Sequence, residues 1–272
     1  MNRRNLLCAA AAITVTSCST AGNHSQTELP RVRVILVGDS TIATRTGYGD
    51  ALCGMFRANV SCINLARGGR SSGSFRAEGL WDQMMARLAG PEKFASTYVL
   101  IQFGHNDQPG KPGRSTDLAT EFPVNMARYV AEVKQAGAVP VLVTPLTRRT
   151  FRDGVLRNDL EPWADATRRV AQTSKTALLD LNADSAAAVS AMGSAEADTL
   201  AEEPPPAKPV SSPATTQDNA KAEPNGAPKS RFDYTHLGAK GATLFARMVT
   251  REIAQAVPAL AAHVDSSKGT AR

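Results

Sequence analysis

The sequence predicts an α/β fold in which a parallel sheet of about five strands lies between two layers of helices, a flavodoxin-like three-layer α/β/α sandwich. Three observations predict it. The apolar runs are short and continuous, which is typical of strands buried on both faces. A stretch of helical periodicity follows each run, as in βαβ units with right-handed crossovers. The 272 residues, 42% of them hydrophobic, are enough for one sizeable core.

Each expected strand is a mostly aliphatic run. The first contains Val32, Val34 and Leu36 and is followed directly by Gly38-Asp39-Ser40. The expected strands are 32–37, 60–65, 97–103, 139–144 and 177–181. The expected helices, which have apolar residues at helical spacing, are 49–57, 78–88, 118–135, 162–173 and 239–256.

The segment 184–231 breaks this pattern. It is rich in Ala, Pro, Ser, Glu and Lys and includes Pro204-Pro205-Pro206. Because it has almost no large apolar residues to offset the entropy lost on ordering, we interpret it as a disordered insertion in one domain that spans 31–272. A linker between two domains is the alternative, but the one helix expected after it is too little to form a domain.

The first residues predict export. Two arginines precede an apolar run, 6–15, that is too short to span a bilayer, so residues 1–18 are interpreted as an export signal. Val15-Thr16-Ser17-Cys18 resembles a bacterial lipobox, in which Cys18 would be lipidated and would tether the protein to a membrane. We therefore expect a periplasmic or outer-membrane lipoprotein. Plain secretion, with Cys18 removed, is the alternative.

Two cysteines remain after the export signal, Cys53 on an expected helix and Cys62 on the second expected strand. An oxidising compartment permits a disulfide between them. Two buried free thiols are an equal alternative.

The charge distribution argues against nucleic-acid binding. The formal net charge is +6, and Lys and Arg are scattered rather than gathered in one run. No histidines occur with Cys or carboxylates at metal-ligand spacing, so neither a metal nor another cofactor is expected. We expect a monomer.

Polar residues that could take part in catalysis lie where the expected parallel strands end. Ligands bind at this edge of such sheets. Ser40 follows the first strand, Gly69 the second and Asn106 the third, while Asp233 and His236 precede the last helix. A serine nucleophile requires a base, a group that orients the base, and donors for the oxyanion. The sequence supplies all of these.

These blocks resemble the SGNH (GDSL-type) hydrolase superfamily, whose blocks are a GDS serine, a glycine, a GxND asparagine and a DxxH pair. The segments that make the resemblance narrower are GDSTIA, NLARGGRSS, QFGHND, TPLTRR and DYTHLGAKGA. They resemble the rhamnogalacturonan acetylesterase branch of carbohydrate esterases. The resemblance covers about 33–183 and 231–255.

The resemblance implies a role for each residue. Ser40 would be the nucleophile, His236 its general base, and Asp233 the carboxylate that orients the imidazole. The oxyanion hole would consist of the backbone N–H groups of Ser40 and Gly69 and the side-chain amide of Asn106. The implied reaction is removal of O-acetyl groups from a plant cell-wall polysaccharide, with a pectic substrate expected.

The residues after the second strand include three arginines, Arg67, Arg70 and Arg76. One or more of them, Arg70 in the first place, would bind galacturonate carboxylates. Solvated or internally paired arginines are the alternative. We expect His105 to be structural, as a donor that fixes its loop.

Several alternatives remain open from the sequence. Ser40 would simply cap a turn, and Asn106 would bond its own loop. Ser71 lies in a G-x-S-x-G pattern but is separated from its strand, which argues against a nucleophile elbow. Another acyl specificity, such as acetylxylan, lipid or thioester hydrolysis, is the alternative enzyme. A non-catalytic carbohydrate-binding lipoprotein is the alternative from another class.

Overall fold

The fold is taken from a computed structural model, which describes residues 29–203 and 232–269. Its centre is a five-stranded sheet in the order β2-β1-β3-β4-β7 with every pairing parallel. The strands are β1 (Val32–Gly38), β2 (Val60–Asn64), β3 (Ser96–Gln102), β4 (Val139–Val143) and β7 (Ala177–Leu179). This confirms the expected sheet and its five strands.

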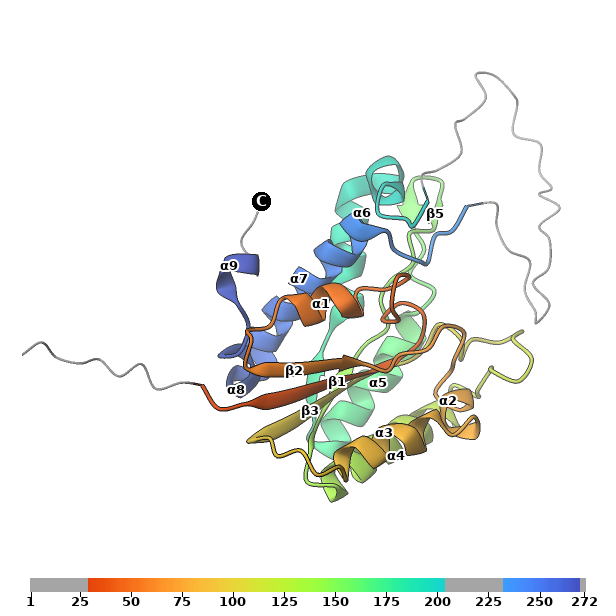
Figure 1. The fold of residues 1–272 in the computed structure, drawn as a ribbon. Coiled ribbons are helices and arrows are strands. Elements are labelled where there is room, and N and C mark those ends of the chain that lie inside the picture. Colours follow the sequence, from red (N-terminus) through yellow and green to blue (C-terminus); the bar gives the residue numbers. More distant parts are fainter. Residues whose placement is uncertain (1–28, 204–231, 270–272) are drawn as a thin grey trace, which may run out of the picture.

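Helices cover both faces of the sheet (Figure 1). One face carries α1 (Gly49–Gly54), α6 (Leu181–Asp198), α7 (Ala239–Ala256) and the short α8 (Pro258–Ala261). The other carries α3 (Leu80–Leu88), α4 (Phe122–Gln135) and α5 (Glu161–Ser174), with the short α2 (Ser74–Ala77) at one end. A last turn of helix is α9 (Ser266–Gly269).

Strand β1 is apolar from Val32 to Val37 except at Arg33, whose guanidinium donates to the Arg87 carbonyl at 2.8 Å. Val34 and Leu36 pack into the core beneath α1 and α7, whereas Ile35 and Val37 pack beneath α3 and α4. Successive side chains of a strand point to opposite faces, so a strand covered on both faces favours apolar residues on both. The three-layer sandwich follows from this pattern.

Some element bounds differ from the expected ones. The expected helix 78–88 is preceded by the separate turn α2, because Gly79 adopts a left-handed φ of 71° that interrupts the helix. Helix α4 begins at Phe122 rather than 118, because the Asp117 carboxylate accepts hydrogen bonds from the N–H groups of Ala119 and Thr120 and forms a turn there. A small hairpin, β5 (Phe151–Arg152) and β6 (Val155–Leu156), was not expected.

The expected insertion 184–231 begins too early. Residues 184–198 belong to helix α6, which is buried through Val189 and Ala197 and kinks at Gly193. The prediction was wrong there because alanine has the highest helix propensity, so an alanine-rich segment forms a helix although only a few of its residues, among them Val189 and Ala197, are buried in the core. Residues 204–231 lie outside the described residues, as does the expected lipidation site at Cys18.

Cys53 and Cys62 form a disulfide that joins α1 to β2, which resolves the alternative left open by the sequence. Among the described residues, no helix has the length and apolar character needed to cross a membrane. The apolar run 6–15 lies outside those residues.

Candidate active site

Ser40 lies two residues beyond β1, at the carboxyl edge of the sheet. The chain leaves β1 toward β2 on one side and later returns to form β3 on the other, so Ser40 lies at the topological switch point where such sheets bind ligands. The Ser40 residue is 8% exposed. Its backbone carbonyl accepts a hydrogen bond from the Thr46 hydroxyl at 2.8 Å, which closes the loop beneath it.

A buried chain of hydrogen bonds fixes this loop. The Tyr48 hydroxyl donates to Gln102 Oε1 (2.8 Å), and Gln102 Nε2 donates to Thr41 Oγ1 (2.7 Å). Thr41 in turn donates both its hydroxyl (2.8 Å) and its backbone N–H (2.9 Å) to Asp39 Oδ1. Since all four residues are buried, each of these polar groups would cost free energy without its partner. The chain therefore locks the residues on either side of Ser40.

The second loop lies against Ser40. A Cβ placed on Gly68 would stand 3.7 Å from the Ser40 Cβ, so these two residues are neighbours. Gly69 has a φ of 79°, a left-handed conformation that favours glycine. Asn106 Nδ2 donates to the Arg70 carbonyl at 3.1 Å, which places the Asn106 amide over this loop. The amide carries two N–H groups, and this contact uses one of them.

The residues on either side of Asn106 tie three loops together. His105 Nδ1 lies 3.3 Å from Asp39 Oδ2 in the nucleophile loop. Asp107 accepts hydrogen bonds from the Ser72 backbone N–H (3.0 Å), the Ser72 hydroxyl (2.5 Å) and the Thr116 hydroxyl (2.8 Å). Asn106 is thus held between two contacts: His105 fixes it to the loop that contains Ser40, and Asp107 fixes it to the loop after β2.

Burial sets the charge of both anchors. It lowers the pKa of His105, against the opposing effect of Asp39, and the positive charges of Arg148 and Lys111 act in the same direction as burial. His105 is therefore neutral at neutral pH and has the structural position expected for it. Burial raises the pKa of Asp107 to about 6, although the hydrogen bonds from Ser72 and Thr116 oppose the rise.

Asp233 and His236 form a close pair before α7. His236 Nδ1 lies 2.6 Å from Asp233 Oδ2, while Asp233 Oδ1 accepts the backbone N–H groups of Thr235 (2.8 Å) and His236 (2.9 Å). Burial alone would raise the pKa of Asp233, but the hydrogen bonds from His236 and Thr235 outweigh it and hold the pKa well below its ordinary value. Asp233 is therefore an ionised acceptor that orients the imidazole through Nδ1.

Arg149 holds the turn that carries this pair. Its fully buried guanidinium donates to the backbone carbonyls of Asp233 (2.7 Å), His236 (2.8 Å) and Thr235 (3.4 Å). The Arg149 backbone N–H also donates to the Tyr234 carbonyl at 2.9 Å. Arg149 lies within the segment TPLTRR, from which the sequence predicted no role for it. Two adjacent arginines directly after a buried strand were the one feature that could have pointed to such a role.

Thr46 joins the two distant segments. It bonds the Ser40 carbonyl through its hydroxyl, and its own carbonyl accepts the N–H of Leu237 at 2.9 Å. The segment after His236 therefore lies against the loop of Ser40. No hydrogen bond joins Ser40 Oγ to His236 in the described structure.

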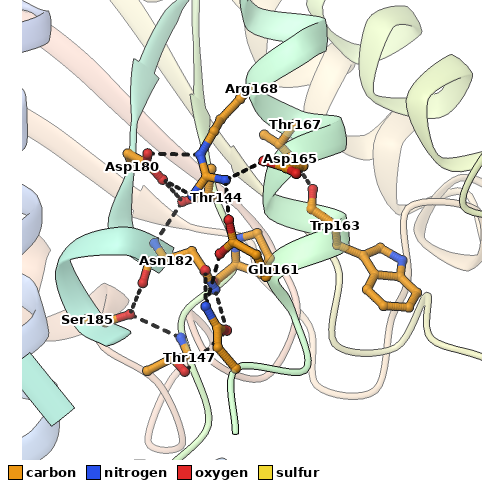
Figure 2. A network of polar contacts seen from close by, with 12 residues as sticks. Thr144, Thr147, Glu161, Trp163, Asp165, Thr167, Arg168, Asp180, Asn182 and Ser185 are labelled. Atoms are coloured by element: carbon orange, nitrogen blue, oxygen red, sulfur yellow. Dashed lines mark hydrogen bonds and ion pairs between the residues drawn. The ribbon is translucent and has the colours of Figure 1, made fainter. Parts of the chain in front are cut away.

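The loop after β4, which carries Arg149, is held by the polar network of Figure 2. Arg168 of α5 lies between Asp180, Glu161 and Asp165, and Thr144 Oγ1 donates to Asp180 Oδ1 at 3.0 Å. The remaining members link the loop to α6. These bonds are Thr147 N–H to Ser185 Oγ (3.1 Å), Asn158 Nδ2 to Asn182 Oδ1 (2.7 Å) and Asn182 Nδ2 to the Pro145 carbonyl (2.7 Å).

Two other residues considered from the sequence have internal partners. Ser71 is fully buried, and its hydroxyl lies 3.2 Å from Ser74 Oγ, which leaves it unsuited to attack a substrate. Arg76 is paired with Glu132 at 3.1 Å and lies over the ring of Tyr129. These contacts give both residues a structural role.

Arg70, the first candidate for binding galacturonate, also has partners. Its guanidinium lies 2.8 Å from the Glu78 carboxylate and donates to the Gly68 carbonyl at 2.7 Å. A role for Arg70 in substrate binding stays a prediction.

The assembled groups have the parts of an acyl-transfer site. They comprise a hydroxyl, an imidazole oriented by an ionised carboxylate, and backbone and amide donors beside the hydroxyl. Among the described residues, no three His, Cys, Asp or Glu side chains form a group that would hold a metal ion.

Comparison with known proteins gives matches over the same region. The sequence model of the GDSL-like Lipase/Acylhydrolase family matches residues 36–244. "Probable rhamnogalacturonan acetylesterase YesY" of Bacillus subtilis (strain 168) is 32% identical over 155 residues, which are 54% of this chain and 69% of that protein. "Rhamnogalacturonan acetylesterase RhgT" of the same strain is 29% identical over 246 residues, 88% of this chain and 96% of that protein.

Solved structures share the fold. Protein YXIM_BACsu of Bacillus subtilis has a TM-score of 0.62 and 23% identity; the match covers 83% of this chain and 56% of that one. A catalytic mutant of Axe2, an acetylxylan esterase from Geobacillus stearothermophilus, has a TM-score of 0.56 and 16% identity, with 81% and 93% covered.

Proposed function

Because the chain belongs to the GDSL-like lipase/acylhydrolase family and is a carboxylic ester hydrolase of the acetylesterase type, we propose that it removes O-acetyl groups from rhamnogalacturonan through an acetyl-enzyme on Ser40. One observation carries the serine mechanism. The Asp233–His236 pair is fixed by Arg149 and lies, through Thr46, against the loop of Ser40.

In the first half-reaction, Ser40 Oγ attacks the acetyl carbonyl carbon while His236 Nε2 takes the hydroxyl proton. Asp233 keeps its negative charge and stabilises the imidazolium that forms. The N–H groups of Ser40 and Gly69 and the amide of Asn106 donate to the oxyanion, and each such donor lowers the barrier by about 3–4 kcal/mol.

Collapse of the tetrahedral intermediate breaks the bond to the sugar oxygen, which leaves with the proton from His236. The acetyl-enzyme on Ser40 is then hydrolysed. His236 Nε2 takes a proton from water, the resulting hydroxide attacks the acetyl carbon, and the proton returns to Ser40 Oγ as acetate leaves. Each turnover consumes one water molecule and releases acetate and the de-acetylated sugar.

The polysaccharide is proposed from the relatives. Two proteins named for rhamnogalacturonan acetylesterase activity align with this chain, one of them across 96% of its length. The likeness to an acetylxylan esterase rests on 16% identity and supports the fold alone. Acetylxylan is therefore the competing outcome of the substrate test.

The test measures acetate release from an aryl acetate and from acetylated rhamnogalacturonan, acetylxylan and chitin oligosaccharides. Wild-type enzyme is expected to release acetate fastest from rhamnogalacturonan, and Ser40→Ala is expected to release none above background from any substrate. Mass spectrometry of Ser40 peptides after a rapid acid quench is expected to find the acetyl adduct. Turnover that persists in Ser40→Ala would remove Ser40 as the nucleophile. No turnover by either protein would favour a carbohydrate-binding protein.

We also propose export and lipidation at Cys18, on the basis of the sequence 15–18. Radiolabelled palmitate is expected to label the wild-type chain, and Cys18→Ser is expected to lose both the label and the membrane fraction. A chain that is secreted and unlabelled in both forms would support plain secretion.

A further inference from the structure

A groove of about 430 Å³ lies beside the nucleophile loop. Its wall includes Thr46, whose hydroxyl bonds the Ser40 carbonyl, and Gly68, which lies against the Ser40 side chain. From there the groove follows the carboxyl end of the edge strand β2 to helix α3, where Leu80 and Gln83 form part of the wall. A polymer with one sugar at Ser40 would extend naturally into this groove.

Three arginines line the groove, and all three are exposed: Arg45, Arg67 and Arg87. They come from three separate segments, namely the loop after Ser40, the loop after β2 and the end of α3. None of the described residues in the wall is an Asp or a Glu. Asp50 lies nearby, where its Oδ1 accepts hydrogen bonds from Asn64 and Thr44.

The pairing of these arginines differs from that of other arginines around the site. No ion pair between described residues includes an arginine of the groove. By contrast, Arg70 pairs with Glu78, and Arg148 pairs with Asp159 at 2.6 Å. The positive charge of the groove is therefore available to a ligand, whereas that of its neighbours is already compensated.

We propose that this groove is a carboxylate-binding subsite that takes the carboxylate of a uronic acid residue of the polymer bound at Ser40. The inference rests on the proposed function and adds to it the residues that recognise acidic sugars. Arg67, which follows β2 beside Gly68, is the main contact, and Arg45 and Arg87 add positive charge to the same wall.

The chemistry of the wall fits such a ligand. A guanidinium presents parallel N–H donors that match the two oxygens of a carboxylate. The apolar side chains of Leu65 and Leu80 offer a surface for the C–H face of a sugar ring, and the Gln83 amide offers hydrogen bonds to hydroxyl groups. A neutral acetylated polymer would make the apolar contacts and the hydrogen bonds to Gln83, but it would have no carboxylate for the guanidinium groups.

The test compares Arg67→Gln with wild type on two acetylated oligosaccharides, one of rhamnogalacturonan and one of xylan. The ratio of kcat/KM for the acidic to the neutral substrate is expected to fall about tenfold, mainly through KM, since one charge-assisted hydrogen-bonded contact is lost. Arg45→Gln and Arg87→Gln are expected to lower the same ratio. Arg31→Gln is the matched control, because Arg31 is exposed and lies before β1, at the opposite edge of the sheet.

Binding separates this inference from the proposed function. De-acetylated rhamnogalacturonan oligosaccharide is titrated calorimetrically into Ser40→Ala and into the Ser40→Ala/Arg67→Gln double variant, and its carboxyl-reduced form serves as the neutral probe. The double variant is expected to lose affinity for the acidic form and to bind the reduced form as the single variant does. Equal affinities for the acidic form, or an equal loss for both forms, would overturn the subsite. If the binding difference is found but the wild-type protein releases no acetate, the esterase proposal is overturned and the subsite is not.

Discussion

Two sets of arginines at the carboxyl edge of the sheet differ in whether their charge has a partner. On the β4–β7 side, Arg168 lies 2.7 Å from Glu161, 2.6 Å from Asp165 and 2.9 Å from Asp180 (Figure 2). On the same side, Arg149 is buried against three backbone carbonyls. On the β2–β1 side, the arginines of the groove have no carboxylate partner among the described residues.

The difference indicates that paired arginines at this edge fix backbone positions, whereas unpaired ones are available to bind a ligand. Compensated charges fix backbone positions, because a charge removed from water is tolerated only when it is paired or hydrogen-bonded. The compensated half carries the turn of Asp233 and His236, where the proposed mechanism requires fixed positions. The open half lies where a substrate would enter, and its exposed charges keep their hydration until a ligand replaces it.

The largest loss of activity is expected from Asp233→Asn, a substitution in the half of the edge where charges are paired. The amide no longer stabilises the imidazolium and favours the wrong tautomer of His236, so kcat is expected to fall about 10³–10⁴-fold. Some stability is also expected to be lost, because the low pKa of Asp233 shows that its ionised form stabilises the turn, although the asparagine oxygen can still accept the N–H groups of Thr235 and His236. Steady-state kinetics on an aryl acetate, with thermal unfolding as the check on folding, measure this. A loss below tenfold would show that Asp233 does not orient the base.

Arg149→Met tests whether the turn needs its buried clamp. The variant leaves three carbonyls without their donor, so His236 is expected to shift and kcat to fall about 10²-fold while KM changes little. Unfolding by urea is expected to show a loss of about 2–4 kcal/mol, since each unsatisfied buried carbonyl costs about 1–3 kcal/mol.

Arg149→Lys is the companion variant, because it keeps the charge and restores part of the hydrogen bonding. It is expected to recover part of kcat. A fall in stability without a fall in kcat of the folded Arg149→Met enzyme would show that the clamp serves folding alone.

Glu252 sharpens the comparison, because it is a carboxylate of the compensated half that has no hydrogen-bond partner among the described residues. Burial in α7, together with the charges of Asp184 and Asp180, raises the pKa of Glu252 to about 8. The unfolded chain has the ordinary, lower value, so wild type is expected to lose stability as the pH rises from about 4.5 to about 8, by roughly 2–4 kcal/mol.

Glu252→Gln is expected to remove that loss, so that it matches wild type at pH 4 and exceeds its stability at pH 8. Urea unfolding at the two pH values measures the difference. Parallel curves for the two proteins across this range would show that Glu252 keeps an ordinary pKa.

The smallest effect is expected from Arg168→Gln. The Arg168 side chain is 24% exposed and its partners are more exposed still, so screening by water reduces the value of the pairs. We expect a loss of about 1–2 kcal/mol in urea unfolding and less than a threefold change in kcat. Arg31→Gln is the control. A tenfold loss of kcat would show that the pairs of Arg168 also help to position His236.

The sequence predicted those features that depend on local pattern. The strand 32–37 could be recognised because all its residues except Arg33 are apolar, which is typical of a strand covered on both faces. The roles of Ser40, Asn106 and His236 were inferred from short motifs next to element ends, and they stay predictions. The role of Arg149 could not be inferred, because it acts on backbone carbonyls about 85 positions away and leaves no side-chain pattern.

One further failure has a physical cause. Residues 184–198 form a helix that is buried at only a few positions, among them Val189 and Ala197, so their composition resembled that of a disordered segment. The sequence favoured Arg70 over Arg67 for substrate binding, and only the fold shows that Arg70 is paired with Glu78 whereas Arg67 lines the groove.

The groove is built from segments 43–46, 64–68 and 80–87, none of which contributes a residue to the network of Figure 2. If the proposed subsite is right, variation along these three segments is expected to change which polymer is accepted with little effect on the Asp233–His236 pair. Thr46 and Gly68 are the exceptions, since Thr46 bonds both to the Ser40 loop and to the segment after His236, and Gly68 lies against Ser40. A library intended to redirect this enzyme toward neutral glycans should leave these two residues unchanged.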